Sequence, residues 1–290
     1  MSIHLSIAGR SDIGRSRHHN EDALVIADLA GGHLLRGDAP RGRFDVGESG
    51  VLLAVSDGMG GENAGEVASA LVVESLARAV MGSPPGAPAD VLEDAVQEAN
   101  GEVVEASHQA GRHGMGATLT ALLVKAHRST TTAFIAEVGD SRAYLLRAGR
   151  LTLLTKDQSY TQLLLDAGTL DAKEAAESPL HNVILQAMGH ASHIDTALGR
   201  LELRSRDCLL LCSDGLTNAV ADEEICRIVL SSSGLEEACN RLVDVANERG
   251  GKDNVTVLAA GVGGEVLRGG AGDDVEQTFQ VLASFEPKVR

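Results

Sequence analysis

Acidic residues recur where the apolar segments of this chain begin or end. Any one of them could be an ordinary Asp-Gly or Asp-Ser turn. Five such places in one chain, most without a Lys or Arg beside them, indicate carboxylates that converge around a cation. Two carboxylates about 5 Å apart repel each other by about 3 kcal/mol at an effective dielectric near 20. The residues concerned are Asp57, Asp140, Asp214, Asp253 and the adjacent pair Glu21 and Asp22.

The residue types of this acidic group select the kind of ion. Carboxylate oxygens with no interleaved Cys or His suit Mg²⁺ or Mn²⁺ better than zinc. The cysteines form no CxxC pair and lie in apolar segments, so we expect buried, reduced thiols with no metal or disulfide role. They are Cys208, Cys212, Cys226 and Cys239.

The composition excludes several classes of function. With 25 basic and 41 acidic residues the chain carries a formal charge of −16, which repels nucleic-acid backbones. It has no Trp, two Tyr and four Phe, so few aromatic side chains are present on which nucleic-acid bases could stack. No apolar run approaches the ~20 residues that span a bilayer, and no signal peptide is visible. We expect a cytoplasmic protein with no nucleic-acid or membrane partner, and a monomer because no long exposed apolar helix is left over.

Short strands are expected to position the acidic residues. Apolar or alternating runs bounded by Gly, Asp and Ser are typical of strands. Those within 117–155 are joined by tight connections, which favours antiparallel hairpins, because parallel strands need long crossovers. The predicted strands are 3–8, 22–29, 50–56, 117–126, 130–138, 142–147, 150–155, 198–203, 207–213 and 254–261.

Helices are predicted between and after these strands. Asn63 and Glu66 have the spacing of a capping box, which opens a first helix that runs to about residue 80. The proline-rich segment 83–88 ends it, and a second helix covers about 89–110. A third helix carries an apolar stripe of period 3.6 over 235–246. The chain is therefore predicted to be one α+β domain.

Three regions stand apart from this pattern. Residues 30–50 look like a long hairpin excursion between two strands. A helical insertion at about 159–195 interrupts the strand series, and Ser159 and Gln162 form a second capping box at its start. Residues 263–290 are Gly-rich and acidic at first, and we expect a mobile tail there, outside a domain that covers 1–262.

Six segments, taken in order, resemble the motif series of the metal-dependent serine/threonine protein phosphatases (type 2C, or PPM). The resemblance covers roughly residues 5–262, and the form DGMGG is similar to the bacterial branch. It implies a central sandwich of two antiparallel β-sheets flanked by pairs of helices (α-β-β-α), with a helical flap. It also implies Mg²⁺- or Mn²⁺-dependent hydrolysis of phosphoserine and phosphothreonine by direct attack of a metal-bridging hydroxide. The segments are SDIGRSRHHNEDAL, SDGMGGENAGEVAS, GMGATLTALLV, VGDSRAYLLR, CSDGLTNAV and GGKDNVTV.

The resemblance implies a set of ligands for two metal ions. Asp57 matches the aspartate that bridges both ions. Glu21 and the carbonyl of Gly58 match further ligands of the second ion. Asp214 and Asp253 match the remaining ligands of the first ion.

Other site residues follow from the same resemblance. Asp22 matches a residue that holds metal-bound waters, and Arg17 matches the arginine that grips the substrate phosphate, for which its planar fork is suited. Asp140, together with Asp214, matches the position of a third, weaker ion, although Asp140 could instead cap a hairpin turn. Ser56, beside the bridging aspartate, is expected to be a bystander that packs or hydrogen-bonds.

The chain departs from the family pattern at two positions. Met59 stands where eukaryotic members carry a histidine proposed as general acid, and a thioether cannot donate a proton. His18 and His19 are either candidates for that role or polar residues of a loop. Gln158 stands where many bacterial members have a histidine.

Partners and alternatives follow from the resemblance as well. Phosphorylated proteins are the implied partners, including a serine/threonine kinase or its substrates. The flap either packs on the core or provides a docking surface for them, and Thr278 is either a phosphorylation site read by a partner domain or an ordinary tail residue.

The main alternative to an active phosphatase is a catalytically weak regulatory binding module, which would be expected to have lost metal ligands. A phosphatase dedicated to one anti-sigma-type switch protein is a further possibility.

Overall fold

A computed structural model describes residues 3–60, 64–127, 130–171, 174–175, 178, 180, 183–264 and 274–287. Asn63, which we predicted to open the first helix, lies outside the described residues, as do parts of the flap and of the C-terminal segment.

The first of two antiparallel sheets has the strand order β10-β9-β12-β13-β1-β4. It brings the N-terminal strand next to one of the last strands in the chain. Its members are β1 (Ile3–Asp12), β4 (Arg41–Val46), β9 (Arg142–Arg147), β10 (Arg150–Leu153), β12 (Cys208–Cys212) and β13 (Val255–Gly263).

The second sheet has the order β14-β11-β8-β7-β5-β2-β3, with β6 paired to β5, and its strand pairs are also antiparallel. The strands are β2 (Asp22–Asp28), β3 (His33–Leu35), β5 (Val51–Met59), β6 (Gly116–Ala117), β7 (Leu119–His127), β8 (Thr130–Val138), β11 (Ala197–Glu202) and β14 (Phe279–Ala283).

The predicted strands agree closely with the observed ones. β8 and β9 occupy the predicted residues, and the other predicted strands differ by a few residues at their ends. The central strands are buried along almost their whole length, as all five residues of β12 illustrate. Strands covered on both faces read as continuous apolar runs, which made them easy to find in the sequence.

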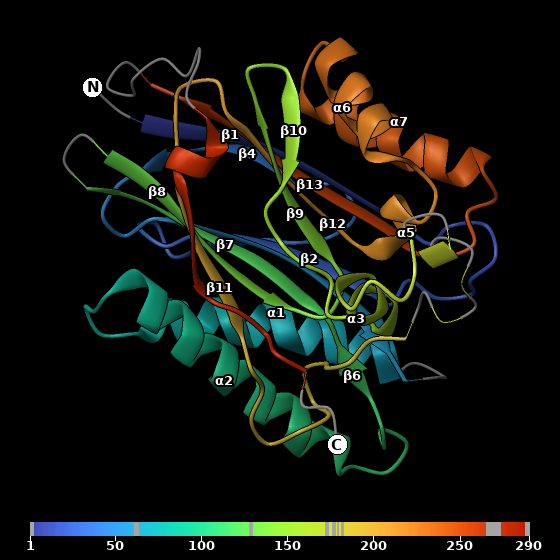
Figure 1. The fold of residues 1–290 in the computed structure, drawn as a ribbon. Coiled ribbons are helices and arrows are strands. Elements are labelled where there is room, and N and C mark those ends of the chain that lie inside the picture. The colour runs from blue at the N-terminus through green and yellow to red at the C-terminus, as the bar shows by residue number, and fades with distance from the viewer. Residues whose placement is uncertain are drawn as a thin grey trace.

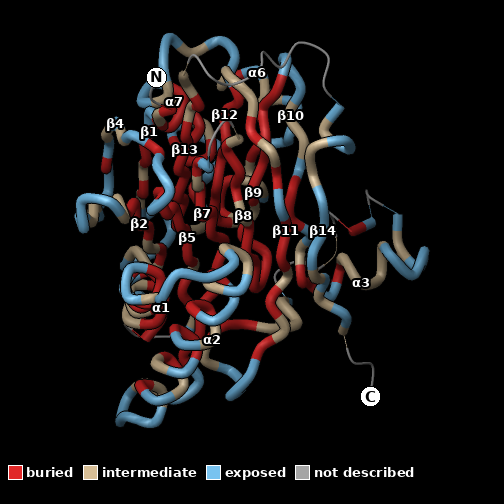
Figure 2. The backbone as a smooth tube through the Cα atoms, turned by 90° about the vertical axis from the view of Figure 1, so that its left-hand side faces the viewer, coloured by how far each residue is buried: buried red, intermediate tan, exposed pale blue. Residues whose placement is uncertain are grey.

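Helices cover the outer face of each sheet, so the molecule has four layers (Figure 1). α1 (Ala64–Gly82) and α2 (Pro88–Ser107) pack on the second sheet around a core that includes Leu52, Leu76 and Leu123. α6 (Asp222–Ser231) and α7 (Leu235–Glu248) pack on the first sheet. A third core, with Leu53 and Leu258, fills the space between the sheets, and Figure 2 shows the buried strands stacked there. The predicted α-β-β-α sandwich is confirmed.

The helices differ in how clearly the sequence predicts them. α2 begins at Pro88, whose missing N–H costs nothing in the first turn, and α7 buries most of the predicted stripe, including Leu242 and Ala246. We did not predict α6, which follows the four-residue helix α5 (Asp214–Thr217) and buries only Ile225 and Ile228. A ten-residue helix with so few buried residues carries a weak periodic signal.

Two of the regions set apart in the sequence contribute strands. The excursion at 30–50 supplies β3 to the second sheet and β4 to the first. The prediction of a mobile tail is wrong for residues 279–283, because β14 pairs with β11 and Phe279 packs against the core between the sheets. A short 3₁₀ helix, η1 (Val275–Gln277), precedes β14.

A buried ion pair ties this C-terminal strand to the domain. Arg147 donates to both oxygens of Asp207 at 2.9 and 2.7 Å, and the two side chains are 3% and 1% exposed. Arg147 also donates to the hydroxyl of Thr278 at 2.6 Å and to the carbonyl of Glu202 at 3.0 Å. One guanidinium therefore joins β9, the end of β11 and the residue before β14.

We expect Arg147→Met to lower the free energy of unfolding by about 3–5 kcal/mol, because Asp207 is left as a buried charge without its partner. The double variant Arg147→Met/Asp207→Leu should lose less than the single one, and Arg150→Met, at an exposed position of β10, should change stability by less than about 0.5 kcal/mol. Urea denaturation measures all three. Equal losses for Arg147→Met and Arg150→Met would contradict the assignment.

Candidate metal centre

The predicted acidic residues all lie at one end of the sandwich. In the second sheet, antiparallel pairing brings the start of β2 beside the end of β5, with the end of β8 two strands away. In the first sheet, the end of β12 lies between the starts of β9 and β13. Each acidic residue lies at or next to one of these strand ends, so the topology gathers side chains that are far apart in the chain.

Asp22 and Asp57 are the most constrained pair. They are directly opposite each other in the β2–β5 register, which puts their Cβ atoms about 4.5–5.5 Å apart on one face of the sheet. Burial and the neighbouring charge of Asp22 raise the pKa of Asp57 well above its ordinary value. Burial raises the pKa of Asp22 to about 7, against hydrogen bonds from Thr256 and Ser213 that lower it. The fold therefore holds two like charges together.

Three further carboxylates extend this cluster. Burial and the charge of Asp253 raise the pKa of Asp214. Burial and the charge of Asp214 raise the pKa of Asp140 to about 8, and Asp140 also acts electrostatically on Asp57. Asp140, in the turn between β8 and β9, thus faces the same group of charges as the others.

Arg17 lies at the edge of the cluster. Its Nη2 atom donates to Oδ2 of Asp253 at 2.7 Å, and its side chain is 47% exposed. That hydrogen bond, together with the charges of Asp253, Glu21 and Asp57, raises the pKa of Arg17. The neighbouring Arg15 lies 3.8 Å from Asp12 instead. Arg17 therefore combines contact with the carboxylates and access to solvent.

Glu21 and Gly58 are held by a close backbone approach. The N–H of Gly58 donates to the carbonyl of Glu21 at 3.0 Å. A Cβ atom on Gly58 would lie 2.1 Å from the carbonyl oxygen of Gly65 in α1, and one on Gly65 would lie 2.6 Å from Oε1 of Glu21. Only glycine fits at both positions, so α1 begins directly against the end of β5 and beside the Glu21 carboxylate.

Three polar residues that we did not single out from the sequence orient the cluster. Asn254 accepts from the N–H of Glu21 at 2.8 Å and donates to the carbonyls of Ile13 and His19 at 2.9 and 3.0 Å. The hydroxyl of Ser213 donates to Asp22 at 2.7 Å, and that of Thr118 accepts from the N–H of Asp57 at 2.9 Å. Each belongs to a quoted segment, but only tertiary structure reveals its partner.

The donor set fits hard divalent cations. All its side-chain ligands are oxygens, and two buried carboxylate oxygens, Oδ1 of Asp22 and Oδ1 of Asp214, have no hydrogen-bond partner. Within the described ranges, no three His, Cys, Asp or Glu side chains are arranged at the spacing of metal ligands. The cluster thus has unmet acceptors and an excess of like charge that a cation would relieve.

The structure also shows the burial and contacts of the other residues that the sequence analysis singled out. Ser56 is fully buried and donates to the carbonyl of Thr118 at 2.6 Å, in keeping with a packing role. Met59 is half-buried beside the cluster, and His18 and His19 are exposed. Cys208, Cys212 and Cys239 are buried as predicted, but Cys226 is only half-buried, because α6 buries a single narrow face.

The flap begins beside this cluster. Ser159 caps α3 (Tyr160–Asp166) by accepting from the N–H of Gln162 at 3.2 Å, so the second capping box is confirmed in part. Gln158 is buried and bridges two segments, since it accepts from the N–H of Gly139 at 2.9 Å and donates to the carbonyl of Glu137 at 3.1 Å. Gln158 thus fastens the flap to the turn that carries Asp140.

Comparisons with known proteins agree with this architecture. The family model for protein phosphatase 2C matches residues 30–257. The serine/threonine protein phosphatase PstP of Mycobacterium tuberculosis is 38% identical over 264 residues, which cover 90% of this chain and 46% of PstP. The serine/threonine phosphatase stp of Listeria monocytogenes is 35% identical over 254 residues, which cover 86% of this chain and 92% of stp.

A solved structure strengthens the comparison. The catalytic domain of PstP in complex with two manganese ions superposes with a TM-score of 0.73 at 36% identity, covering 90% of this chain and all of that one. The chain therefore belongs to the protein phosphatase 2C family of metal-dependent serine/threonine phosphatases. It spans about half the length of full PstP. Among the described helices, none is long and apolar enough to cross a membrane.

The raised pKa values predict how stability depends on pH without divalent ions. Asp22 and Asp140 titrate at about 7 and about 8 in the folded state but near 3.9 in an unfolded chain. The folded state therefore binds more protons between these values, and stability must fall as pH rises through that window. In EDTA, we expect the melting temperature to fall from about pH 5 to about pH 8.

Removing the two titrating groups tests this cause. Asp22→Asn/Asp140→Asn should make the dependence shallower, with Asp57 and Asp214 still contributing to it, whereas Asp94→Asn, on the exposed face of α2, should leave it in place. Differential scanning calorimetry at several pH values measures both. A slope that is the same in all three proteins would show that the acidic cluster is not its source.

Proposed function

We propose that this chain is a phosphoprotein phosphatase that removes phosphate from serine and threonine with two divalent ions, Mg²⁺ or Mn²⁺. The observation that carries the proposal is the convergence of an all-carboxylate cluster with Arg17 at its exposed edge. Membership of the protein phosphatase 2C family supports it, as does the pair of manganese ions in the structure of the related PstP domain.

The proposed ligands follow the family pattern. Asp57 would be shared by both ions, with Glu21 and the carbonyl of Gly58 on one side and Asp214 and Asp253 on the other. Two divalent ions would supply a water activated for direct attack on phosphorus near neutral pH and would neutralise charge on the phosphate oxygens. Asp140 and Asp214 are the residues that a third, weaker ion would use, and the electrostatic proximity of Asp140 to Asp214 supports that assignment.

Arg17 is proposed to hold the phosphate of the substrate. Its guanidinium has five N–H donors, and Asp253 takes one of its terminal nitrogens, so the others can contact phosphate oxygens. A cation on Asp253 would weaken that carboxylate's hold on Arg17 and leave more of the planar fork to the phosphate. Asp22, fixed by Ser213 at 2.7 Å, is proposed to order water within the cluster.

Protonation of the departing serine or threonine oxygen needs a source other than Met59. His18 and His19 precede Glu21 on the same segment and are exposed. The carbonyl of His19 is fixed by Asn254, so the backbone of this segment is held near the cluster. Either histidine or water is proposed to supply the proton.

The substrates are proposed to be proteins that carry phosphoserine or phosphothreonine, including a serine/threonine kinase or its targets. The names of PstP and stp support this class of substrate. That the chain is a monomer and works in the cytoplasm stays a prediction from the sequence.

The proposal predicts metal-dependent turnover. With Mn²⁺ the protein should hydrolyse p-nitrophenyl phosphate and a phosphothreonine peptide, and EDTA should abolish both activities. Asp57→Asn should reduce them to background, because the shared ligand is lost, while Asp94→Asn should retain them. Isothermal titration with Mn²⁺ gives a second readout. The absence of both binding heat and turnover would favour the regulatory binding module instead, and turnover in EDTA would contradict the metal-dependent proposal.

Substitution of Arg17 tests the phosphate contact separately. Arg17→Ala should lower kcat/KM by about 10–100-fold, since a hydrogen bond to a charged group contributes about 1.5–3 kcal/mol. Arg15→Ala, two residues away and outside the cluster, is the matched control and should keep kcat/KM within about twofold of the wild type. Steady-state kinetics on the phosphothreonine peptide, at saturating Mn²⁺, measures both. Equal kinetics for the two variants would remove Arg17 from the phosphate site.

A further inference from the structure

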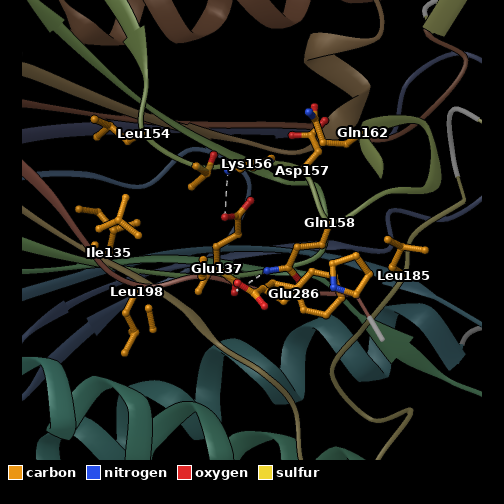
Figure 3. Close-up of a pocket in the computed structure, with 18 of the residues that line it drawn as sticks. Ile135, Glu137, Leu154, Lys156, Asp157, Gln158, Gln162, Leu185, Leu198 and Glu286 are labelled. Atoms are coloured by element: carbon orange, nitrogen blue, oxygen red, sulfur yellow. Dashed lines mark hydrogen bonds between the residues drawn. The ribbon is translucent and has the colours of Figure 1, made fainter. Parts of the chain in front are cut away.

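A cavity lies on the side of the second sheet where the flap and the C-terminal strand meet. Its volume is about 290 Å³, at the small end of the range for ligand pockets. The walls are largely apolar and come from β8, β11, α3 and β14, with Ile135, Leu163, Leu198 and Phe279 among them. Figure 3 shows Ile135, Leu154 and Leu198 on one side of Glu137, and Gln158 and Leu185 on the other.

Glu137 is the unusual residue of this cavity. It is 3% exposed, and its Oε2 atom accepts from the N–H of Lys156 at 3.1 Å. Its other oxygen, Oε1, is buried without a hydrogen-bond partner. An unpartnered buried acceptor destabilises the fold, and more so if it is charged. Burial also raises the pKa of Glu137 well above its ordinary value, so the side chain lacks both a donor to Oε1 and a positive charge that would favour its ionised form.

The charges around Glu137 indicate the sign of that ligand. Among the described lining residues, the carboxylates are Glu137, Asp157, Asp166 and Glu286, and the only cationic side chain is Lys156. Lys156 is already paired with Asp166 at 2.6 Å, and Asp157 is paired with Arg142 at 2.7 Å. Among the described residues this leaves Glu137 and Glu286 as lining carboxylates without an ion pair, and a positively charged donor would be attracted to them.

We propose that this cavity binds a small organic cation, with an ammonium or guanidinium group against Oε1 of Glu137 and an apolar body against the walls. The cation would supply the missing donor, and burial of its apolar part would add the hydrophobic contribution. The site does not use the carboxylates of the candidate metal centre. It is connected to them through Gln158, which donates to the backbone carbonyl of Glu137 and accepts from the N–H of Gly139, next to Asp140.

Methyl-labelled NMR spectroscopy with 2-phenylethylammonium as the probe tests the proposal. We expect saturable shifts of the Ile135 and Leu198 methyl signals in the wild-type chain at millimolar probe. Glu137→Gln keeps the shape of the side chain but cannot form an ion pair with the probe, and should weaken binding at least tenfold. The neutral analogue 2-phenylethanol should bind both proteins alike, because it makes no ion pair.

A second pair of variants keeps the test decisive if Glu137→Gln does not fold. Leu163→Trp should fill the cavity and abolish the shifts, whereas Leu164→Trp is the matched control, since Leu164 is also half-buried on α3 but is not among the lining residues described. The absence of saturable shifts in the wild-type chain, or equal affinity in the wild type and either Glu137→Gln or Leu163→Trp, would overturn the proposal. The readout needs neither divalent ions nor phosphatase activity, so it stands apart from the proposed reaction.

Discussion

Repulsion between carboxylates that the fold forces together is the constraint on which this structure depends. Strand register sets Asp22 directly opposite Asp57, and the neighbouring strand ends add Asp140, Asp214 and Asp253. The free energy gained by burying apolar strands in three cores opposes this repulsion. It fixes the positions of the strand ends regardless of the charges that they carry. A one-residue slip between β2 and β5 would turn Asp22 and the apolar residues after it to the wrong faces, so the pairing that creates the repulsion is also the one that the cores require.

The sequence was most informative where one physical pattern decided the outcome. Continuous apolar runs located the central strands, because those strands are covered on both faces. The acidic residues at their ends, together with the ordered motifs, indicated the candidate metal centre and a phosphate-binding role for Arg17. Antiparallel connections then required that these ends meet, and the pKa shifts show that Asp57, Asp140 and Asp214 do lie within electrostatic reach of one another.

Features that depend on distant partners could not be predicted in the same way. β14 forms a strand because it pairs with the edge of β11 and Phe279 packs against the core between the sheets. The Gly-rich segment before β14 had led us to predict a tail there. The contact between Gly58 and Gly65 is invisible until α1 packs on β5. Glu137 reads as an unremarkable polar residue in an apolar strand, and its isolation becomes evident only when segments from four parts of the chain close around it.

The amide of Asn254 has a consequence for how the N-terminal segment can vary. One side chain accepts from Glu21 and donates twice, to Ile13 and His19, so it needs both a donor and an acceptor end. An aspartate has the same outline but, when ionised, can only accept. It would turn both donated bonds into contacts between oxygens and add a negative charge where too many already gather. Deamidation at this single position would therefore release the loop that carries Arg17 without altering the shape of any side chain.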